Sequence, residues 1–322
     1  MVIGGGLTGL SAAYELEQFE IPYTLIEVKP RLGGGITSVH RGGFIFDSGR
    51  MCHPIANWES FLAHLDGLNL RQAIFAADST QVFFTEGTER LIKALAKCIT
   101  APILRRMAVS TLGQMPDGGR FLICLENGLA LEASGVIVAA PARYAERILY
   151  TLSPDAAYRL LDYRYDSIAR ISLGYTGTAA RVCEATIESW STNVLSDANI
   201  LDHQELSHST RVPPGGIIAQ IARRGDPTGI FLANPAQLVQ ELTTQLDWPP
   251  NPTAYHIGFW PESDPVMYRV AEHSATLAEI NRLLPERVVL AGSDYIPTSV
   301  PPRLDERIQQ GLMAARRLSQ FL

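Results

Sequence analysis

Three glycines near the start of the chain have the spacing of a loop that binds phosphate groups. Gly4, Gly6 and Gly9 form a G-x-G-x-x-G pattern between a short apolar strand and an expected helix over residues 10–18. In such a loop the first glycine permits a tight turn, the second lets the backbone approach a pyrophosphate, and the third lets the helix pack closely on the strand. The amides and the dipole of the helix then face the phosphates, so this stretch predicts a dinucleotide site.

An acidic residue, Glu27, follows a second expected strand over residues 23–26. A carboxylate at this place in a strand–helix–strand unit accepts hydrogen bonds from the hydroxyls of an adenosine ribose. It also disfavours a phosphorylated ribose, because two negative groups would then lie side by side. The sequence therefore predicts an unphosphorylated adenosine ribose, which FAD and NAD both contain.

The composition argues against several other kinds of site. The four cysteines, at positions 52, 98, 124 and 183, are widely spaced, so we expect neither a disulfide framework nor a metal site. With 322 residues, 46% of them hydrophobic, the chain is long enough for about two domains. The net charge of −6 gives no basic face for nucleic acid, and apolar runs such as residues 136–140 are far shorter than the ~20 residues that span a bilayer.

The N-terminus enters the nucleotide-binding strand at once, which leaves no room for a signal peptide. The cysteine spacing is typical of a reducing compartment, and we therefore expect a cytoplasmic protein. The first strand is short by a residue or two, so the true start of the protein could lie upstream of Met1.

The segment after Glu27 distinguishes a flavin from a nicotinamide cofactor. Residues 27–37, with Arg31 and the Gly33-Gly34 pair, and residues 43–49, which end in Asp47-Ser48-Gly49, resemble the second signature of the flavin-containing amine oxidase superfamily. This superfamily includes protoporphyrinogen oxidases, phytoene desaturases and the smaller renalases. In it, the acid is followed by a basic residue, a Gly-Gly pair and an Asp-x-Gly turn that leads toward the flavin ring.

The resemblance implies a fold of the α/β class with two domains. We expect a glutathione-reductase-like, Rossmann-type FAD-binding domain that is discontinuous and comprises residues 1–56, 84–145 and 286–322. A second α+β substrate domain, built on a mixed sheet, would comprise residues 57–83 and 146–285. The family's membrane-docking helical insertion is trimmed in this chain.

Hydrophobic periodicity predicts the elements that position these motifs. Helices are expected over residues 58–65, 87–96 and 235–246, and from near Pro302 onward. Strands are expected over residues 103–112, 121–125, 135–140, 168–174, 216–222 and 287–292.

The resemblance also implies which residues contact FAD. These are Gly4, Gly6, Leu7, Thr8 and Gly9 in the first loop; Glu27, Val28, Arg31, Gly33 and Gly34 in the second; Gly49, Arg50 and Met51 after the Asp-x-Gly turn; Val109; and Gly292, Asp294, Arg303 and Leu304 near the C-terminus. We expect the flavin to be bound non-covalently, because no cysteine occurs in the C-terminal part, where covalently flavinylated relatives carry theirs.

Three departures weaken the interpretation as a simple amine oxidase. Gly35 occupies a position where many relatives have an arginine near the cofactor phosphates. The chain has only three lysines, and none lies where amine oxidases place the lysine that holds a water at flavin N5. Arg303 replaces an aromatic residue that would form half of the cage around an amine.

The catalytic residues stay unassigned. Cys52 and His53 follow the Asp-x-Gly turn and could attach the flavin or act as a base, with ordinary packing as the alternative. The segment from Phe259 to Tyr268 resembles one that precedes the return strand in protoporphyrinogen-oxidase-like proteins. It could form an aromatic plug or contact the substrate.

The function that this resemblance implies is an FAD-dependent oxidoreductase. Such an enzyme removes a hydride from a C–N, C–C or C–H site of a small organic substrate to flavin N5, and oxygen or another acceptor takes the electrons. The alternatives are a renalase-like oxidase of dihydronicotinamide isomers, an NAD-dependent dehydrogenase and a non-catalytic flavin-binding scaffold.

Overall fold

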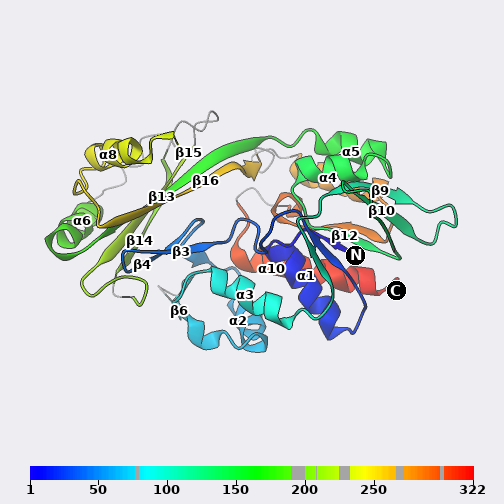
Figure 1. Ribbon diagram of the computed structural model, residues 1–322, viewed down its shortest axis with the longest axis horizontal. Helices are drawn as coiled ribbons and strands as arrows, with labels where there is room; N and C mark the ends of the chain where they lie inside the picture. Colours follow the sequence, from blue (N-terminus) through cyan, green and yellow to red (C-terminus); the bar gives the residue numbers. More distant parts are fainter. Residues whose placement is uncertain (77–79, 190–199, 208, 225–232, 266–271, 298–300) are drawn as a thin grey trace.

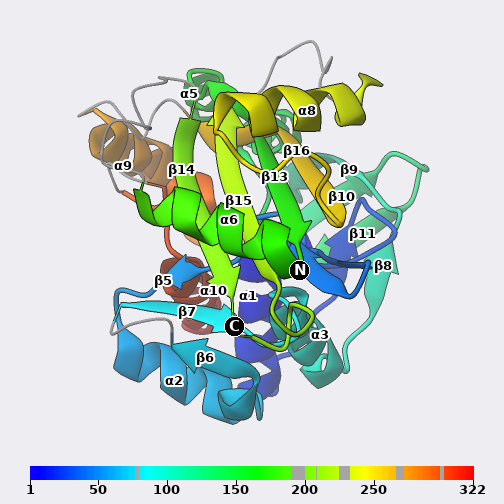
Figure 2. The same ribbon diagram turned by 90° about the vertical axis from the view of Figure 1, so that its left-hand side faces the viewer.

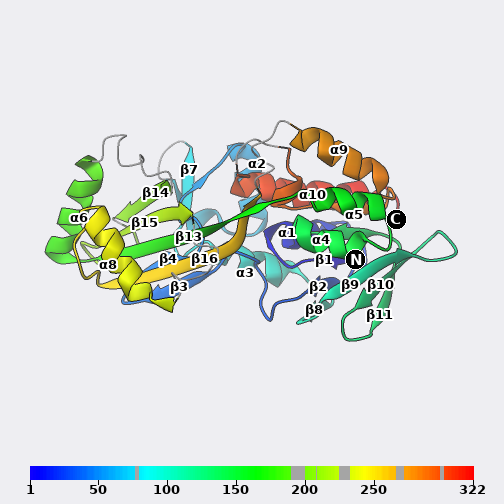
Figure 3. The same cartoon turned by 90° about the horizontal axis from the view of Figure 1, so that it is seen from above.

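The structure is a computed structural model. It describes residues 1–76, 80–189, 200–207, 209–224, 233–265, 272–297 and 301–322. The molecule is elongated, with a parallel sheet and its helices at one end and an antiparallel sheet at the other (Figure 1). Strands β13 (Tyr165–Tyr175) and β16 (Ala254–Pro265) run between the two ends, as the view from above also shows (Figure 3).

The parallel sheet has five strands in the order β17-β12-β1-β2-β8. The strands are β1 (Val2–Ile3), β2 (Leu25–Glu27), β8 (Ile103–Arg105), β12 (Val136–Val138) and β17 (Val288–Leu290). The central strands are short apolar runs because both of their faces are covered by other elements. This confirms the Rossmann-like sheet that the sequence predicted.

Three helices pack on one face of this sheet: α1 (Leu7–Gln18), α3 (Glu89–Cys98) and α10 (Leu304–Ser319). Helices α1 and α10 cross closely because Gly311 has no side chain. A Cβ at Gly311 would lie 2.3 Å from the carbonyl oxygen of Thr8. The other face is covered by α4 (Ala142–Leu149), α5 (Pro154–Leu160), α9 (His273–Leu283) and a small antiparallel sheet.

That small sheet consists of β9 (Val109–Gln114), β10 (Phe121–Leu125) and β11 (Ala130–Ala133). The prediction of one strand over residues 103–112 was therefore wrong, because β8 and β9 belong to different sheets. Arg106 lies between them with φ at 57°, a backbone conformation that interrupts an extended strand. β8 pairs with β2, whereas β9 pairs with β10.

The second large sheet has the order β14-β15-β13-β16, with β14 (Ile200–Ser207) and β15 (Ile217–Arg224). We expected a mixed sheet, but every strand pair in its described part is antiparallel. Helices α6 (Gly177–Ser189) and α8 (Pro235–Gln245) cover one face, and Figure 2 shows α6 lying across the strands. Because neighbouring residues of a strand face opposite ways and Ile171 packs under the helices, Arg170 and Ser172 lie on the other face.

Smaller elements connect the two ends. They are the hairpin β3 (Ser38–Arg41) and β4 (Phe44–Asp47); the sheet of β5 (His53–Pro54), β7 (Gln81–Phe84) and β6 (Ile74–Ala76); helix α2 (Trp58–Gly67); and a 3₁₀ turn, η4 (Ser293–Tyr295). The hairpin packs its phenylalanines against the uncovered face of the antiparallel sheet. Within the described ranges, no helix is both long and apolar enough to cross a membrane.

Candidate cofactor site

The three glycines of the first loop have two kinds of environment. A Cβ at Gly9 would lie 1.9 Å from the carbonyl oxygen of Gly4, and a Cβ at Gly4 would lie 2.4 Å from that of Ala139. At Gly6, the nearest atom to a Cβ would be the Cα of Gly34, 3.9 Å away. Gly4 and Gly9 therefore permit close packing of the protein itself, whereas Gly6 leaves open space.

The N-terminus of α1 is suited to an anion. Gly6 is its N-cap, no side chain caps the helix, and its first turn contains no acidic residue. The amide of Leu7 and its neighbours in the first turn thus have no side-chain acceptor in the N-cap. Together with the dipole of α1, these amides favour a negative group beside Gly6.

The second loop lies directly against the first. Gly33 and Gly34 have φ at 103° and 58°, conformations that glycine adopts easily. A Cβ at Gly34 would lie 3.2 Å from the Cα of Gly6. Arg31 holds this turn, since its Nη2 donates to Gly34 O at 2.8 Å and its Nη1 donates to Leu32 O at 3.2 Å.

Glu27 lies between the two loops at the end of β2. Its Oε2 accepts a hydrogen bond from the Gly5 amide at 2.6 Å, and its Oε1 accepts one from the Lys29 amide at 2.7 Å. The carboxylate is buried, whereas the neighbouring Val28 side chain is exposed. The structure therefore brings Glu27 against the first glycine loop.

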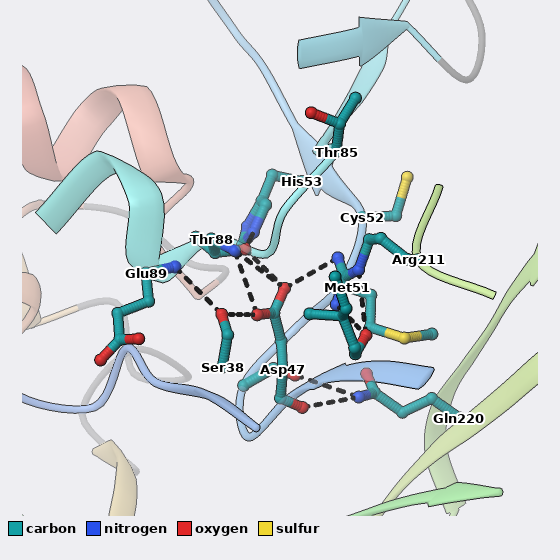
Figure 4. Close-up of polar contacts among 12 residues, drawn as sticks. Ser38, Asp47, Met51, Cys52, His53, Thr85, Thr88, Glu89, Arg211 and Gln220 are labelled. Atoms are coloured by element: carbon teal, nitrogen blue, oxygen red, sulfur yellow. Dashed lines mark hydrogen bonds and ion pairs between the residues drawn. The ribbon is translucent and has the colours of Figure 1, made fainter. Parts of the chain in front are cut away.

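The Asp-x-Gly turn is anchored by a buried carboxylate (Figure 4). One oxygen of Asp47 accepts hydrogen bonds from Ser38 Oγ and, at 3.0 Å, from the Thr88 amide. The other accepts one from Thr88 Oγ1 at 2.7 Å. The guanidinium of Arg211 forms an ion pair with Asp47 at 3.0 Å, and the two side chains are 0% and 2% exposed.

Arg211 comes from the connection between β14 and β15 and crosses to the hairpin. Its Nε and Nη2 donate to the carbonyl oxygen of Ile45 at 3.0 and 2.8 Å. The sequence did not predict this ion pair. The only signal was Asp47 itself in the Asp-x-Gly pattern, because no local pattern connects it with a residue so far along the chain.

Two glutamines of the antiparallel sheet bind the backbone after Asp47. Gln220 Nε2 donates to Asp47 O at 3.3 Å and to Gly49 O at 3.1 Å. Gln204 Oε1 accepts from the amides of Met51 and Cys52 at 2.9 and 3.1 Å, and its Nε2 donates to Cys52 O at 2.9 Å. The sheet therefore fixes the backbone of the turn from one side.

Strand β16 holds the same turn through Ser48. His256 Nε2 lies 2.8 Å from Ser48 Oγ, and Trp260 Nε1 donates to Ser48 O at 3.3 Å. Between them, a Cβ at Gly258 would lie 2.2 Å from Ser48 O. Trp260 also lies 3.8 Å from the Cβ position of Gly35. Trp260 of the predicted aromatic segment thus binds the Asp-x-Gly turn and lies beside Gly35 of the second loop, whereas residues 266–268 of the segment lie outside the described part of the chain.

Gly49 at the end of the turn has open space beside it, whereas the next two residues contact other parts of the protein. A Cβ at Gly49 would meet no atom within 4 Å. Arg50 forms an ion pair with Asp202, and the Met51 side chain is buried in an apolar cluster below the sheet. The Cys52 sulfur points away from Asp47 in Figure 4.

His53 is part of the Asp47 network. Its Nε2 lies 2.9 Å from Thr88 Oγ1, which donates its proton to Asp47, so His53 is the donor in this contact. Burial, with the nearby positive charges of Arg307 and Arg50, holds the pKa of His53 well below its ordinary value. These contacts support packing as its role.

The remaining predicted residues lie near both faces of the parallel sheet. Gly292, with φ at 143°, donates its amide to Gln310 at 2.7 Å. Asp294 accepts hydrogen bonds from Tyr165 Oη at 2.6 Å and from the Ala142 amide at 2.8 Å.

Leu304 is buried in the same core cluster as Leu7, on the face of the parallel sheet that α1 covers. Arg303, the N-cap of α10, is exposed. Thr8 is buried in the first turn of α1. Val109 packs in the other cluster, on the opposite face. Among the residues that the structure describes, no group of three histidine, cysteine or acidic side chains could hold a metal ion.

Comparisons with known proteins agree with this geometry. The family described as flavin containing amine oxidoreductase matches residues 55–319, and the NAD(P)-binding Rossmann-like domain matches residues 2–65.

Among curated proteins, coproporphyrinogen III oxidase of Bacillus subtilis is 40% identical over 55 residues, which are 15% of this chain and 12% of that protein. A possible lysine-specific histone demethylase 1 of Drosophila melanogaster is 37% identical over 51 residues, which are 16% of this chain and 6% of that protein. The matched segments therefore span only a small part of these relatives.

Solved structures share the fold over nearly the whole chain. A putative protoporphyrinogen oxidase from Exiguobacterium sp. 255-15 superposes with a TM-score of 0.77 at 14% identity, covering 100% of this chain and 98% of that one. Putrescine oxidase bound to putrescine superposes with a TM-score of 0.71 at 12% identity, covering 99% and 98%. At such identities the likeness establishes the fold.

Proposed function

Because the chain belongs to the flavin-containing amine oxidoreductase family, we propose that it binds FAD non-covalently and oxidises a small organic molecule by removing a hydride from carbon. The family establishes a flavin-dependent oxidoreductase. The proposal adds the form of the flavin, its mode of attachment and the type of reaction.

The observation that carries this proposal is the free space at two glycines, Gly6 and Gly49. Side chains at Gly6 and Gly49 would meet no protein atom closer than 3.9 Å, whereas Gly34 packs against Gly6, since its Cβ would lie 3.2 Å from Gly6 Cα. Helix α1 begins directly after Gly6 and has no side-chain cap at its N-terminus. The carboxylate of Glu27 accepts a hydrogen bond from the amide of Gly5, the residue before Gly6. This donor set fits a pyrophosphate and an adenosine ribose, and the turn at Gly49 continues toward the position of a ring system.

When bound, the flavin would supply the acceptor for the hydride, with oxygen or another compound taking the electrons onward. The first-turn amides of α1 would bind the pyrophosphate, and Glu27 would accept hydrogen bonds from the ribose. Arg31 would not contact the cofactor itself but would stabilise the turn that places Gly34 opposite Gly6. The contacts of Ser48, Gln204 and Gln220 would keep the turn rigid beside the reacting atoms.

We also propose that the parallel and antiparallel sheets belong to separate domains. Residues 1–56, 84–145 and 286–322 would form the FAD-binding domain, and residues 57–83 and 146–285 the substrate domain. In support, all five strands of the parallel sheet fall in the first set, and all four strands of the antiparallel sheet fall in the second.

The absorption spectrum of the purified protein tests the cofactor. A yellow protein whose colour is released by acid precipitation would support non-covalent FAD, and chromatography of the released compound would distinguish FAD from FMN. Flavin that stays in the pellet would contradict non-covalent binding and would make Cys52 the first linkage candidate. A colourless protein that binds NAD would favour the alternative of an NAD-dependent dehydrogenase.

An anaerobic screen of amines, porphyrinogens and dihydronicotinamide isomers would identify the reaction class from bleaching of the flavin. We expect benzylamine and short alkylamines to be poor substrates. The chain lacks a lysine where amine oxidases place theirs, and Arg303 replaces an aromatic residue of the amine cage. Bleaching by dihydronicotinamide isomers alone would favour a renalase-like oxidase, and the absence of bleaching by every compound would favour a scaffold.

A further inference from the structure

Two arginines share one carboxylate on the cofactor side of the antiparallel sheet. Arg170 of β13 binds Asp202 of β14 through both oxygens, with Nη1 at 2.9 Å from Oδ1 and Nη2 at 3.1 Å from Oδ2. Arg50, the residue after Gly49, binds the same Oδ2 through Nη2 at 2.6 Å. We call these three residues, Arg50, Arg170 and Asp202, the arginine cluster.

The arginine cluster carries one more positive than negative charge. Burial opposes ionisation of Asp202, but Arg170 and Arg50 outweigh it and lower its pKa to about 2, so the carboxylate is charged at neutral pH. The paired contact with Arg170 satisfies both oxygens of Asp202. Arg50 therefore adds a second guanidinium to an acid that is already neutralised.

Arg50 also has hydrogen-bond donors to spare. Its Nε and Nη1 bind no acceptor in the described part of the chain. The exposed fractions of the side chains are 36% for Arg50, 22% for Asp202 and 11% for Arg170. Arg50 is therefore the residue of the cluster that is most accessible to solvent. A guanidinium with free donors matches the two oxygens of a carboxylate, whereas an ammonium group would be repelled by the excess charge.

The cluster lies beside the turn that would face the flavin. On the same sheet face, the neighbouring row of side chains contains Gln204, Gln220 and His256, which hold the turn. Arg170 pairs with Ala222 and Gly258 in the next row of the sheet, two residues further along each strand. Arg50 reaches this row directly from the turn.

We propose that Arg50, supported by Arg170, binds a carboxylate group of the substrate, so that the oxidised molecule is an organic anion and not an alkylamine. This inference rests on the proposed function, since it places the carboxylate next to the flavin. The competing explanation is that Arg50 serves only to clamp the turn to the sheet through Asp202.

The two explanations predict opposite effects for Asp202→Asn. If Arg50 is only a clamp, loss of Asp202 or of Arg50 breaks the same contact, and both variants lose ligand affinity or stability together. If the cluster binds an anion, Arg50→Gln removes the excess charge, whereas Asp202→Asn increases it. Anion affinity should then fall in the first variant and rise in the second.

The test uses 3-phenylpropionate and 3-phenylpropylamine, two probes of the same length and ring that differ in the charged group. Binding to the purified holoenzyme is measured by calorimetry and by perturbation of the flavin spectrum at low ionic strength. We expect the carboxylate to bind and the amine not to bind. Arg50→Gln should weaken carboxylate binding at least about tenfold, Arg50→Lys should restore part of it, and Asp202→Asn should strengthen it.

Arg120→Gln is the matched control, because Arg120 is also a solvent-exposed arginine, at 50% against 36% for Arg50, with acidic partners on a distant hairpin. Equal binding of the amine, or carboxylate binding by Arg50→Gln at parental strength, would overturn the proposal. If the protein carries no flavin, the proposed function fails separately. The same calorimetric titration then still decides whether Arg50 binds carboxylates.

Discussion

A single methyl group at Gly6 should separate cofactor binding from folding. Gly6 has φ −75° and ψ −177°, which any residue adopts, and a Cβ there would lie 3.9 Å from its nearest neighbour, Gly34 Cα. Alanine caps a helix less well than glycine, but it also reduces the freedom of the unfolded chain by about 0.4–1 kcal/mol. These effects oppose each other, so Gly6→Ala should change the unfolding free energy of the flavin-free protein by less than about 1 kcal/mol.

The same methyl group would occupy the space through which a pyrophosphate approaches the backbone. Loss of one charge-assisted hydrogen bond of about 1.5–3 kcal/mol weakens binding roughly 10- to 150-fold. FAD titration of the flavin-free protein, followed by quenching of flavin fluorescence, measures this change, and thermal unfolding of the same sample measures stability.

Gly9→Ala provides the contrast. Its Cβ would lie 1.9 Å from Gly4 O, so this variant should lose stability by about 1–3 kcal/mol or more even without flavin. Parental FAD affinity in Gly6→Ala would refute the placement of the pyrophosphate beside Gly6. Unfolding of Gly6→Ala in the absence of flavin would refute the claim that this space is free of protein.

Three other changes test the turn and a buried histidine. Gly258→Ala should destabilise the protein by about 1–3 kcal/mol in urea denaturation, because its Cβ would lie 2.2 Å from Ser48 O. Asp47→Asn should lower the unfolding free energy by about 3–5 kcal/mol, since it leaves Arg211 buried without a countercharge. Burial lowers the pKa of His64 from 6.5 to about 4, so its stabilising contribution is complete above pH 6.5 and is lost as the pH falls toward 4, by up to about 3 kcal/mol. His64→Gln should therefore flatten the profile of unfolding free energy against pH in this window.

Each of these changes has a control in the same chain. Gly35→Ala should be tolerated, because the nearest atom to its Cβ would be 3.8 Å away. Adding Arg211→Met to Asp47→Asn should recover part of the lost stability, because the unpaired charge is removed. His40 is exposed, so His40→Gln makes the same substitution as His64→Gln and leaves the buried His64 in place. Equal losses in the two glycine variants, no recovery in the double variant, or equal effects of the two histidine variants would contradict the structural reasoning.

The cofactor side of the fold was predictable because its signals are local. The glycine spacing fixed the order of β1, α1 and β2, and short apolar runs identified β12 and β17. The environments of the first-loop glycines follow from the same spacing. A local signal failed between residues 103 and 112, where the apolar pattern is continuous but the positive φ of Arg106 divides it into two strands.

The contacts that hold the Asp-x-Gly turn were not predictable, because they join distant parts of the chain. Asp47 and Arg211 meet only after the antiparallel sheet has formed. One weak signal was available in strand β15, where Gln220 interrupts an otherwise apolar run. A buried amide needs a partner, and here its partners are backbone carbonyl groups of the turn.

The polar contacts around the turn couple the two proposed domains energetically. Asp47 belongs to the first set of residues, whereas Arg211, Gln204 and Gln220 belong to the second. Separating the sheet from the turn would leave a buried carboxylate without its cation and several backbone groups without partners, which is costly in a low-dielectric interior. The turn therefore holds its geometry only while the antiparallel sheet is folded against it. Any change in the sheet that displaces Gln204 or Gln220 should reach the proposed cofactor site through the turn, where Gln220 binds Gly49 directly.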